Sequence, residues 1–433
     1  MASTIRKIDI LLLGSGGREH ALLDKLADSP HAGALYVAPG NGGMLGSATC
    51  VGIDPESPIE VVAWALAHDI GLVVIGPEAP LMAGVADACR SAHIPTFGPN
   101  LEAARIEGSK KFAKQVMGRA GVPTAAWRSF TDEKGCLDYV ARLDGPCVVK
   151  ADGLAAGKGV IVAKDAEEAA EGVRACFSGA FGEAGDSVLI EEALSGPECS
   201  LLVLTDGRTV VPLATSQDHK RAYEGDTGPN TGGMGAYSPV PSVASAEFDE
   251  MIEIMERIVV QLAADGTPYS GCLYGGFMLT DEGPKVLEFN ARFGDPETQA
   301  VLPRMHADLV EVMLACDRGV LDRGMISWDD DWAVSVVLAS AGYPGPYEVG
   351  KPITGIKAAE ALEGVTIYHA GTALDADGTL VTSGGRVLAV TAVAPTFEAA
   401  RARAYEGAGL IDFDGKSFRT DIGMKAVPDR SGL

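Results

Sequence analysis

The chain has 433 residues, 47% of them hydrophobic. This length exceeds what one hydrophobic core usually organises, so we expect several domains. Its 35 basic and 59 acidic side chains give a formal net charge of −24, which disfavours binding to nucleic acid or to an anionic membrane. The eight cysteines form no C-x-x-C pair, and no apolar stretch reaches the length of a membrane span. The composition predicts a cytoplasmic protein that handles small molecules.

The first hundred residues alternate apolar runs with amphipathic segments. Runs such as IDILLLG (8–14) and LVVI (72–75) lack the polar alternation of a half-exposed strand. Parallel strands that helices cover on both faces have this pattern. We therefore predict a doubly wound α/β domain at the N-terminus.

The stretch LLLGSGGREH ends a predicted strand in a glycine turn before a helix. A dinucleotide fingerprint needs a third glycine where Glu19 stands, and the next predicted strand ends without an acid for the ribose, so NAD or FAD binding is disfavoured. Gly16 and Gly17 would still let backbone amides approach an anion, with Arg18 beside them. A plain strand-to-helix turn with a surface arginine explains the same residues equally well, so both interpretations stay open.

The segment VLEFNARFGDPETQ (286–299) carries the residues best suited to a metal. Glu288 and Asn290 alternate on one face of a predicted strand, and two hard oxygen ligands of this kind suit Mg²⁺. Arg292 follows on the same face and could reach a phosphate or a carboxylate. An edge strand with a solvated polar face is the alternative, but its apolar neighbours on both sides argue against it.

A glycine-rich hairpin is predicted at CVVKADGLAAGKGVIVA (147–163). Lys150 ends its first strand, and Lys158 stands between Gly157 and Gly159 in the turn. Backbone amides and ammonium groups in this arrangement can close over a polyphosphate. The order of a Walker A loop is absent, and a flexible surface hairpin with solvated lysines is the alternative.

Four further segments contribute to the predicted architecture. VLIEEALSGPECS (188–200) fits a strand that runs into a turn, and residues 243–262 place apolar side chains on one face of a core helix. The long polar stretch 218–237 contains His219 and Lys220, and a loop of this length is usually a lid or disordered. Beyond the acidic turn at 327–332, short β-like runs predict a small β-rich terminal domain.

In chain order, the motifs GSGGREH, APGNGG, GPEAPL, GSKKFAK, VVKADGLAAGKGV, EEALSGPE, DHKRAYEGDTGPNTGGMGAYSP, LEFNARFGDPETQ and SFRTDIG resemble the ATP-grasp family from end to end. Within it, RFGDPE and PNTGGMG are similar to the ligases that join glycine to 5-phosphoribosylamine. The resemblance implies a reaction of ATP, glycine and 5-phosphoribosylamine that gives glycinamide ribonucleotide, ADP and phosphate, the second step of de novo purine synthesis. A carboxylate is a poor acyl donor, so a glycyl phosphate intermediate is expected.

The resemblance also implies a domain plan, a metal and partners. ATP is a substrate, used with Mg²⁺ or Mn²⁺, and the partners are small molecules together with a transient contact to the enzyme of the preceding step. An N-terminal α/β substrate-phosphate domain, a connecting segment, a small ATP-grasp lid domain, a large ATP-grasp domain and a C-terminal domain are expected at residues 1–105, 106–123, 124–194, 195–330 and 331–433.

Residue roles follow from the same motifs. The residues expected to bind ATP are Lys110, Lys150, Gly157, Lys158, Gly159, Glu191, Leu194 and Glu198. Those expected to bind the ribosylamine are Gly16, Gly17, Arg18, Asn41 and Glu78. The metal ligands are expected to be Glu288 and Asn290, and the catalytic residues Arg292, Lys220, His219 and Asp295.

Two rival interpretations remain. Another ATP-grasp ligase with a different acid or amine would share the lysine hairpin, but RFGDPE argues against it. A nucleotide-binding protein that has lost its chemistry would keep the fold, but the presence of Lys150, Glu288, Asn290 and Arg292 argues against that.

Overall fold

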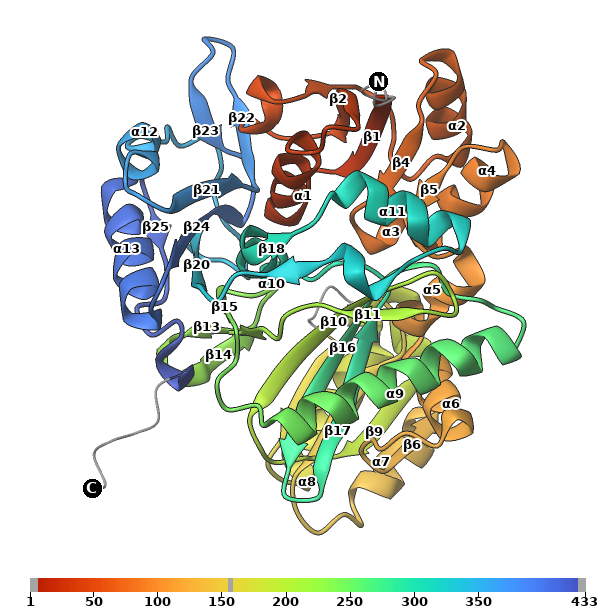
Figure 1. Cartoon of the computed structure of the whole chain (residues 1–433). Helices are drawn as coiled ribbons and strands as arrows, with labels where there is room; N and C mark the ends of the chain where they lie inside the picture. The colour runs from red at the N-terminus through yellow and green to blue at the C-terminus, as the bar shows by residue number, and fades with distance from the viewer. Residues whose placement is uncertain (1–6, 155–158, 427–433) are drawn as a thin grey trace.

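The computed structural model describes residues 7–154 and 159–426, and Figure 1 shows how they are arranged. The N-terminal sheet lies at the top of that view, the two sheets built from residues 127–290 at the bottom, and the C-terminal sheet to the left. In the described residues no helix is both long enough and apolar enough to cross a bilayer.

The N-terminal sheet is parallel, in the order β3-β2-β1-β4-β5. Its elements are β1 (Ile8–Gly14), β2 (Ala32–Pro39), β3 (Thr49–Cys50), β4 (Leu72–Ile75) and β5 (Thr96–Phe97), with α1 (Gly17–Ala27), α2 (Pro58–Ala67), α3 (Glu78–Met82) and α4 (Val85–Ser91). Alternate residues of β1 enter two different apolar cores, one on each face of the sheet. The doubly wound domain predicted from the sequence is confirmed.

The strand order of this sheet reverses at β1, which has β2 on one side and β4 on the other. The segments that follow β1 and β4 therefore leave the same edge of the sheet on either side of a switch point, where open α/β sheets bind ligands. Gly16 lies on the first segment and Glu78 on the second. Topology thus brings two of the predicted substrate residues to one crevice.

A small antiparallel sheet follows, in the order β6-β9-β7-β8, with its own apolar core. The elements from the connecting helices onward are α5 (Leu101–Gly108), α6 (Lys110–Ala120), β6 (Trp127–Phe130), α7 (Glu133–Val140), β7 (Cys147–Ala151), β8 (Val160–Ala163), α8 (Ala166–Ala175) and β9 (Val188–Glu192). The predicted hairpin is the pair β7 and β8. Its turn, with Gly157 and Lys158, lies outside the described residues.

A second antiparallel sheet has the order β11-β10-β16-β17. It consists of β10 (Glu198–Thr205), β11 (Val210–Pro212), β16 (Gly271–Thr280) and β17 (Gly283–Asn290), and α9 (Ser245–Ala264) packs on it. Met251, Met255 and Ile258 of α9 are fully buried in the same core as Val286 and Phe289 of β17. The core helix predicted at 243–262 is confirmed.

The C-terminal sheet has the order β12-β15-β20-β24-β21, with β25 beside β20. Its elements and their neighbours are β12 (Gln217–Asp218), β15 (Gly235–Ser238), β20 (Trp332–Ser340), α12 (Ile356–Glu360), β21 (Val365–His369), β22 (Thr372–Leu374), β23 (Leu380–Thr382), β24 (Arg386–Ala394), α13 (Phe397–Leu410) and β25 (Lys416–Ser417). Because β15 pairs with β20, this sheet extends across the boundary expected at 330/331.

The polar stretch 218–237 is not a free loop. It contains β12 and β15 and, between them, the hairpin β13 (Arg221–Tyr223) and β14 (Thr227–Asn230). Arg419 is 2% exposed and donates to the backbone of Arg221 and to Asp226, so the C-terminal SFRTDIG motif holds this hairpin. These contacts argue against disorder, which polarity alone suggested because it does not reveal partners almost 200 residues away; a lid role stays a prediction.

The remaining helices and strands join the last two sheets. They are α10 (Glu297–Val301), β18 (Met305–His306), α11 (Leu309–Arg318) and β19 (Ser327–Trp328).

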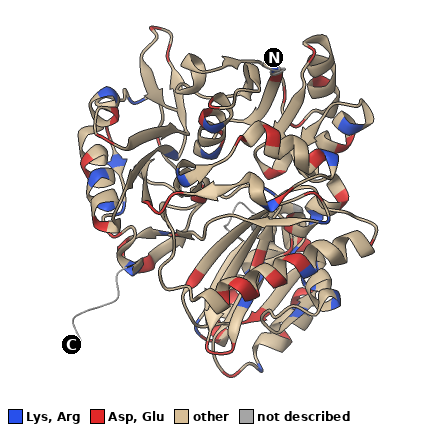
Figure 2. Cartoon of the chain, in the orientation of Figure 1, with Lys and Arg blue, Asp and Glu red and all other residues tan. Residues whose placement is uncertain are grey.

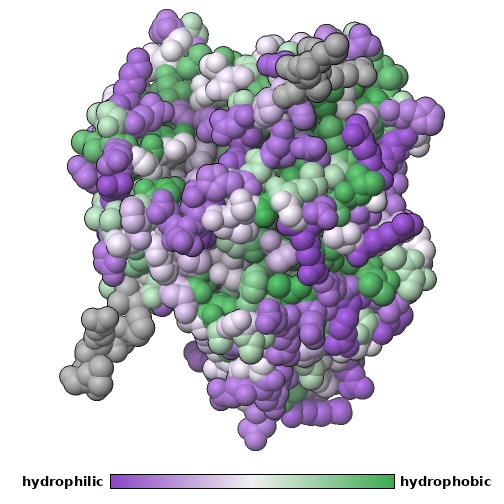
Figure 3. All heavy atoms as spheres, viewed as in Figure 1, coloured by the Kyte–Doolittle hydropathy of each residue, from purple (hydrophilic) through white to green (hydrophobic). Residues whose placement is uncertain are grey.

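Figure 2 shows acidic residues spread over many elements with basic residues among them, and in Figure 3 hydrophilic and apolar residues are interspersed on the visible face. The net negative charge is therefore not gathered in one patch on this face.

Two buried histidines join α1 to β21. The backbone N–H of His369 donates to Nδ1 of His20 at 2.8 Å, and the ring centroids lie 5.5 Å apart. Burial, with a smaller contribution from His369, lowers the pKa of His20 to about 3, and burial lowers that of His369 to about 4. Both rings are neutral in the folded protein, whereas the unfolded chain protonates them below pH ~6.5.

We expect this pair to make the protein acid-sensitive. Above pH ~6.5 both rings are neutral in the folded and the unfolded chain, so they do not change the free energy of unfolding. Below that pH the unfolded chain binds more protons, so the free energy of unfolding falls as the pH drops towards the folded pKa values, by up to ~1.4 kcal/mol per pH unit for each ring. Urea unfolding between pH 7.5 and 4.5 measures the slope. His369→Gln should flatten it, and His93→Asn, at an exposed position with φ 60°, should not. Equal slopes in wild type and His369→Gln would contradict this prediction.

Candidate active site

Lysines and a glutamate predicted to bind ATP form a buried cluster between the two antiparallel sheets. Lys150 Nζ lies 3.0 Å from Oε2 of Glu191 on the adjacent strand β9 and donates to the Leu287 carbonyl at 3.1 Å. Lys110, the first residue of α6, donates to the Gly153 carbonyl at 2.9 Å. Burial lowers the pKa of Lys110 and the nearby charge of Glu288 opposes that shift, so one of the two predicted metal ligands lies within electrostatic reach of Lys110.

Lys114 belongs to the same cluster and was missed from the sequence. Its Nζ lies 2.9 Å from the same Oε2 of Glu191 and donates to Thr124 Oγ1 at 2.8 Å. The side chain is 2% exposed, and burial lowers its pKa to about 8 although Glu191 opposes the shift. A signal was present, since position 114 lies on the apolar face of α6 with Ala113 and Met117.

The other residues predicted for ATP lie at the ends of neighbouring strands. Leu194 follows β9 and is half-buried, and Glu198 begins β10. The Gly159 carbonyl accepts from the Ala151 N–H and closes the described part of the lysine hairpin. These positions agree with a nucleotide between the two sheets, and the individual contacts stay predictions.

A β-bulge at Leu287 explains why Glu288 and Asn290 lie on the face opposite Val286. In the pairing of β16 with β17, Val286 lies opposite Phe277 and Glu288 opposite Gly276, so Leu287 is an extra residue. The bulge lets both Val286 and Phe289 enter the core, and it leaves Glu288 and Asn290 half-buried on the other face. One carboxylate and one amide oxygen side by side fit a divalent cation that completes its shell with phosphate and water.

No group of three or more His, Cys, Asp or Glu side chains within residues 7–154 and 159–426 could hold a metal by itself.

Arg292, two residues after the end of β17, joins this strand to the N-terminal part of the chain. Its Nη2 lies 2.8 Å from Glu107 Oε1 and its Nε 3.3 Å from Glu78 Oε2. Burial acts to raise the pKa of Glu78, but Arg292 and Arg18 bring it below its usual range. Burial outweighs Arg292 at Glu107 and raises the pKa of that carboxyl group. Glu78, predicted for the ribose, thus lies against the arginine predicted for the phosphoryl group.

Lys220 lies near the same metal pair, on the short connection between β12 and β13. Its Nζ is 3.0 Å from Glu198 Oε2 and 3.4 Å from Asp218 Oδ1. Burial opposes the change, but Asp218, Glu198 and more weakly Glu288 raise the pKa of Lys220. The side chain keeps a third of its surface exposed, so its ammonium group remains accessible beside Glu198.

The structure separates His219 from this group. Its side chain is 1% exposed, and Nε2 accepts from the backbone N–H of Gly423 at 3.2 Å. Burial lowers its pKa to about 4. Both observations argue against the catalytic role predicted for His219, because the ring is buried and bonds to the C-terminal segment.

The glycine loop after β1 is bonded to a side chain of the helix that follows it, α1. The Gly16 N–H donates to Glu19 Oε2 at 2.7 Å, and a Cβ at Gly76 would lie 2.2 Å from Glu19 Oε1. Glu19 therefore fills the space that a dinucleotide would need. Arg18 is 6% exposed, forms an ion pair with Glu19 at 2.5 Å and donates to the Phe293 carbonyl at 3.1 Å, so it is directed into the protein.

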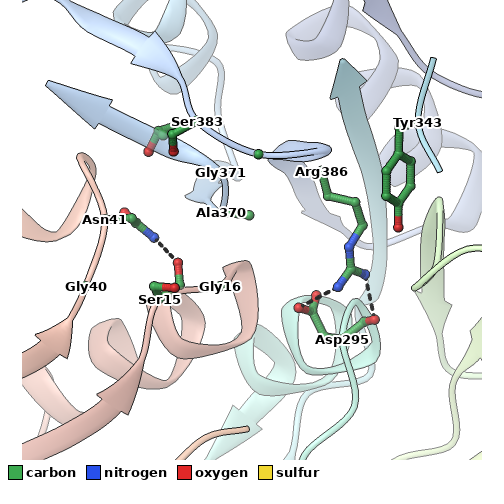
Figure 4. A pocket seen from close by; sticks show the side chains of 12 residues that line it. Ser15, Gly16, Gly40, Asn41, Asp295, Tyr343, Ala370, Gly371, Ser383 and Arg386 are labelled. Carbon is green, nitrogen blue, oxygen red and sulfur yellow. Dashed lines mark hydrogen bonds and ion pairs between the residues drawn. The ribbon is translucent and has the colours of Figure 1, made fainter. Parts of the chain in front are cut away.

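A cavity of about 350 Å³ opens beside this loop, between the N-terminal and C-terminal sheets (Figure 4). It is lined by Ser15, Gly16, Gly40, Asn41, Asp295, Tyr343, Ala370, Gly371, Thr372, Ser383, Gly384 and Arg386. The Arg386 Nη2 lies 2.9 Å from Asp295 Oδ2, and Nη1 donates to the carbonyls of Asp295 and Gly232. The lining is polar, and its arginine and its carboxylate are paired with each other at one side of the cavity, where the guanidinium group could receive an anion.

Asn41 contributes to this cavity as a clamp. Its Nδ2 donates to the Ser15 and His369 carbonyls, both at 2.8 Å, and its Oδ1 accepts from the Gly43 N–H at 2.9 Å. These bonds use both amide hydrogens of Asn41 to hold the glycine loop against β21. The ribose contact predicted for Asn41 would have to replace one of them. Gly17 is likewise turned away, since a Cβ there would lie 2.7 Å from Gln299 Nε2.

Two antiparallel sheets that share a lysine cluster and an oxygen-rich strand, next to an open α/β domain, define the ATP-grasp class of enzymes. The chain belongs to the phosphoribosylglycinamide synthetase family within that class. The family's N domain matches residues 8–107, its ATP-grasp domain residues 108–298 and its C domain residues 333–425.

Relatives agree with this assignment. The chain is 50% identical to the phosphoribosylamine–glycine ligase of Agrobacterium fabrum over 96% of this chain and 98% of that protein, and 48% identical to the ligase of Yersinia pestis over 97% and 99%. A crystal structure of phosphoribosylamine–glycine ligase from Thermotoga maritima has a TM-score of 0.84 at 35% identity and covers 96% of this chain and 100% of that chain. Biotin carboxylase from Campylobacter jejuni, with a TM-score of 0.75 at 15% identity over 98% and 96%, shares the fold.

Proposed function

We propose that this protein is an ATP-dependent ligase that joins glycine to 5-phosphoribosylamine and gives glycinamide ribonucleotide, ADP and phosphate. The observation that carries the proposal is the path of one segment, residues 288–295. Lys150 donates to the Leu287 carbonyl next to Glu288, Arg292 contacts Glu78 of the N-terminal domain, and Asp295 lines the cavity. One segment therefore joins the proposed nucleotide site to the polar cavity, which supports an activation step followed by amide formation.

Glycine is activated on the nucleotide side. One of its carboxylate oxygens attacks the γ-phosphorus of ATP, the bond from that phosphorus to the β,γ-bridging oxygen breaks, and glycyl phosphate and ADP result. Lys150, Lys220 and Arg292 supply positive charge around the developing phosphate oxygens. Glu288 and Asn290 would hold Mg²⁺, which neutralises phosphate charge when bound, and Mn²⁺ with the same preference for oxygen would replace it.

The second step joins the two sites. The neutral amine of the ribosylamine attacks the glycyl carbonyl, the bond from that carbon to the phosphate oxygen breaks, and an amide forms as the nitrogen loses a proton to the departing phosphate. We propose that Asp295 holds Arg386 in place for this step. We assign the 5-phosphate to the Arg386 side of the cavity, since Arg18 is directed away from it and Glu19 occupies the Gly16 N–H. Exclusion of water from the site would protect the acyl phosphate from hydrolysis.

Oxygen-18 tests this order of bond making. With glycine labelled in its carboxylate, one labelled oxygen should appear in the phosphate product, because that oxygen attacks phosphorus and leaves with it. ADP should form at the full rate only when ATP, glycine and ribosylamine are all present. Mass spectrometry of the phosphate and the nucleotide product measures both. Unlabelled phosphate alongside glycinamide ribonucleotide would contradict a glycyl phosphate, and ATP binding without turnover would favour a non-catalytic nucleotide-binding protein.

Several finer expectations belong to the same proposal. The domain boundaries are proposed as 1–105, 106–123, 124–194, 195–330 and 331–433, with β12 and β15 completing the C-terminal sheet. Since the ribosylamine is unstable, we also propose a cytoplasmic reaction and a transient contact with the enzyme of the preceding step.

A further inference from the structure

The cluster around Glu191 contains one more ammonium group than the ATP chemistry uses. Lys114 and Lys150 both contact Oε2 of Glu191, at 2.9 and 3.0 Å. The side chains of all three are at most 7% exposed. A buried carboxylate with two ammonium groups on one oxygen carries a net positive charge, which is costly without a further anion.

The two lysines are held differently. Lys114 has a second fixed partner, Thr124 Oγ1, which itself donates to the Val286 carbonyl at 2.6 Å. The second partner of Lys150 is the Leu287 carbonyl, at the bulge next to Glu288. Lys150 therefore borders the residue next to Glu288, where the phosphates are expected, whereas Lys114 is anchored through Thr124 to Val286.

The remaining oxygen of Glu191 also points to a ligand. Oε1 is buried and has no hydrogen-bond partner among the described residues. A buried carboxylate oxygen without a donor is costly, so a donor is expected when the site is filled. The exocyclic amine of adenine is such a donor, and Glu191 lies at the end of the strand where adenosine is proposed.

We propose that Lys114 is a positioning residue for ATP: it neutralises and orients Glu191 so that Lys150 can leave that carboxylate for the phosphates. The inference rests on the proposed ATP-dependent function. Without Lys114, Glu191 would retain Lys150 as its only counter-ion, because a buried carboxylate does not give up its last partner readily. The phosphates would then lose an ammonium group although Lys150 itself is unchanged.

Binding of ATP and of adenosine, measured by calorimetry, separates this role from general damage. In Lys114→Met the Kd for ATP should rise about tenfold or more, and the ratio of adenosine Kd to ATP Kd should fall, because the phosphates contribute less. Lys114→Arg should restore much of the ratio. Lys111 lies in α6 three residues before Lys114 and outside the cluster, so Lys111→Met should leave the ratio unchanged.

The double variant Lys114→Met with Glu191→Gln provides the decisive comparison. Removing the carboxylate together with its counter-ion frees Lys150, so the ratio should rise above that of Lys114→Met alone. An unchanged ratio in Lys114→Met, or a double variant no better than the single one, would overturn the inference. Ligation by the wild type is measured in parallel, since its failure would overturn the proposed function and leave the binding ratios to be judged separately.

Discussion

Glu288→Gln should lower kcat for ligation by about 100- to 1000-fold and raise the Mg²⁺ concentration needed for half-maximal rate. The variant keeps the size of the side chain and its place on β17, but it removes the only carboxylate of the proposed metal pair. Burial and the bulge at Leu287 leave no second carboxylate on this strand face to replace it. Steady-state ADP release over a Mg²⁺ titration measures both effects.

Glu282→Gln is the matched control. Glu282 lies in the turn before β17, is 77% exposed and pairs with Lys285, so its replacement should change neither kcat nor the Mg²⁺ dependence. Retention of the wild-type Mg²⁺ dependence by Glu288→Gln, whatever its kcat, would show that the metal is bound elsewhere.

The parts of the fold that depend on local pattern follow directly from the sequence. Unalternated apolar runs predict the parallel sheet, and the 3.6-residue spacing of Met251, Met255 and Ile258 predicts the core helix α9. The bulge at Leu287 does not follow from local pattern, because an extra residue is defined only by the strand it pairs with. Glu288 and Asn290 were nevertheless assigned to one face, since both lie on the same side of the bulge.

The substrate cavity shows where sequence reasoning ends. Arg18 is adjacent to the glycine turn in sequence and was therefore predicted to bind the phosphate. In the structure it is paired with Glu19, and the cavity receives Arg386, more than 360 residues further along the chain (Figure 4). A long-range contact between β24 and the loop after β1 leaves no local signal. His219 is a similar case, because its partner Gly423 belongs to the C-terminal segment.

Arg386→Met should raise the KM for the ribosylamine by about 100-fold while the KM for ATP changes little. A guanidinium group that contacts a phosphate in a bidentate manner contributes several kcal/mol that a methionine cannot replace. Arg386→Lys keeps the charge but loses the planar fork, so its KM should lie between the two. Initial rates with ribosylamine generated in situ, at saturating ATP and glycine, measure the effect.

Arg18→Met distinguishes the two arginines. It leaves Glu19 buried without its partner and should cost about 3 kcal/mol of folding stability, yet the folded fraction should retain a KM for the ribosylamine close to that of the wild type. Arg386 also bonds Gly232 and Asp295, so some loss of stability is expected there too, but only Arg386→Met should change the KM for the ribosylamine relative to that for ATP. If Arg18→Met instead gave the larger change in that ratio, the phosphate would lie at the glycine loop, and Glu19 would have to release the Gly16 N–H when substrate binds.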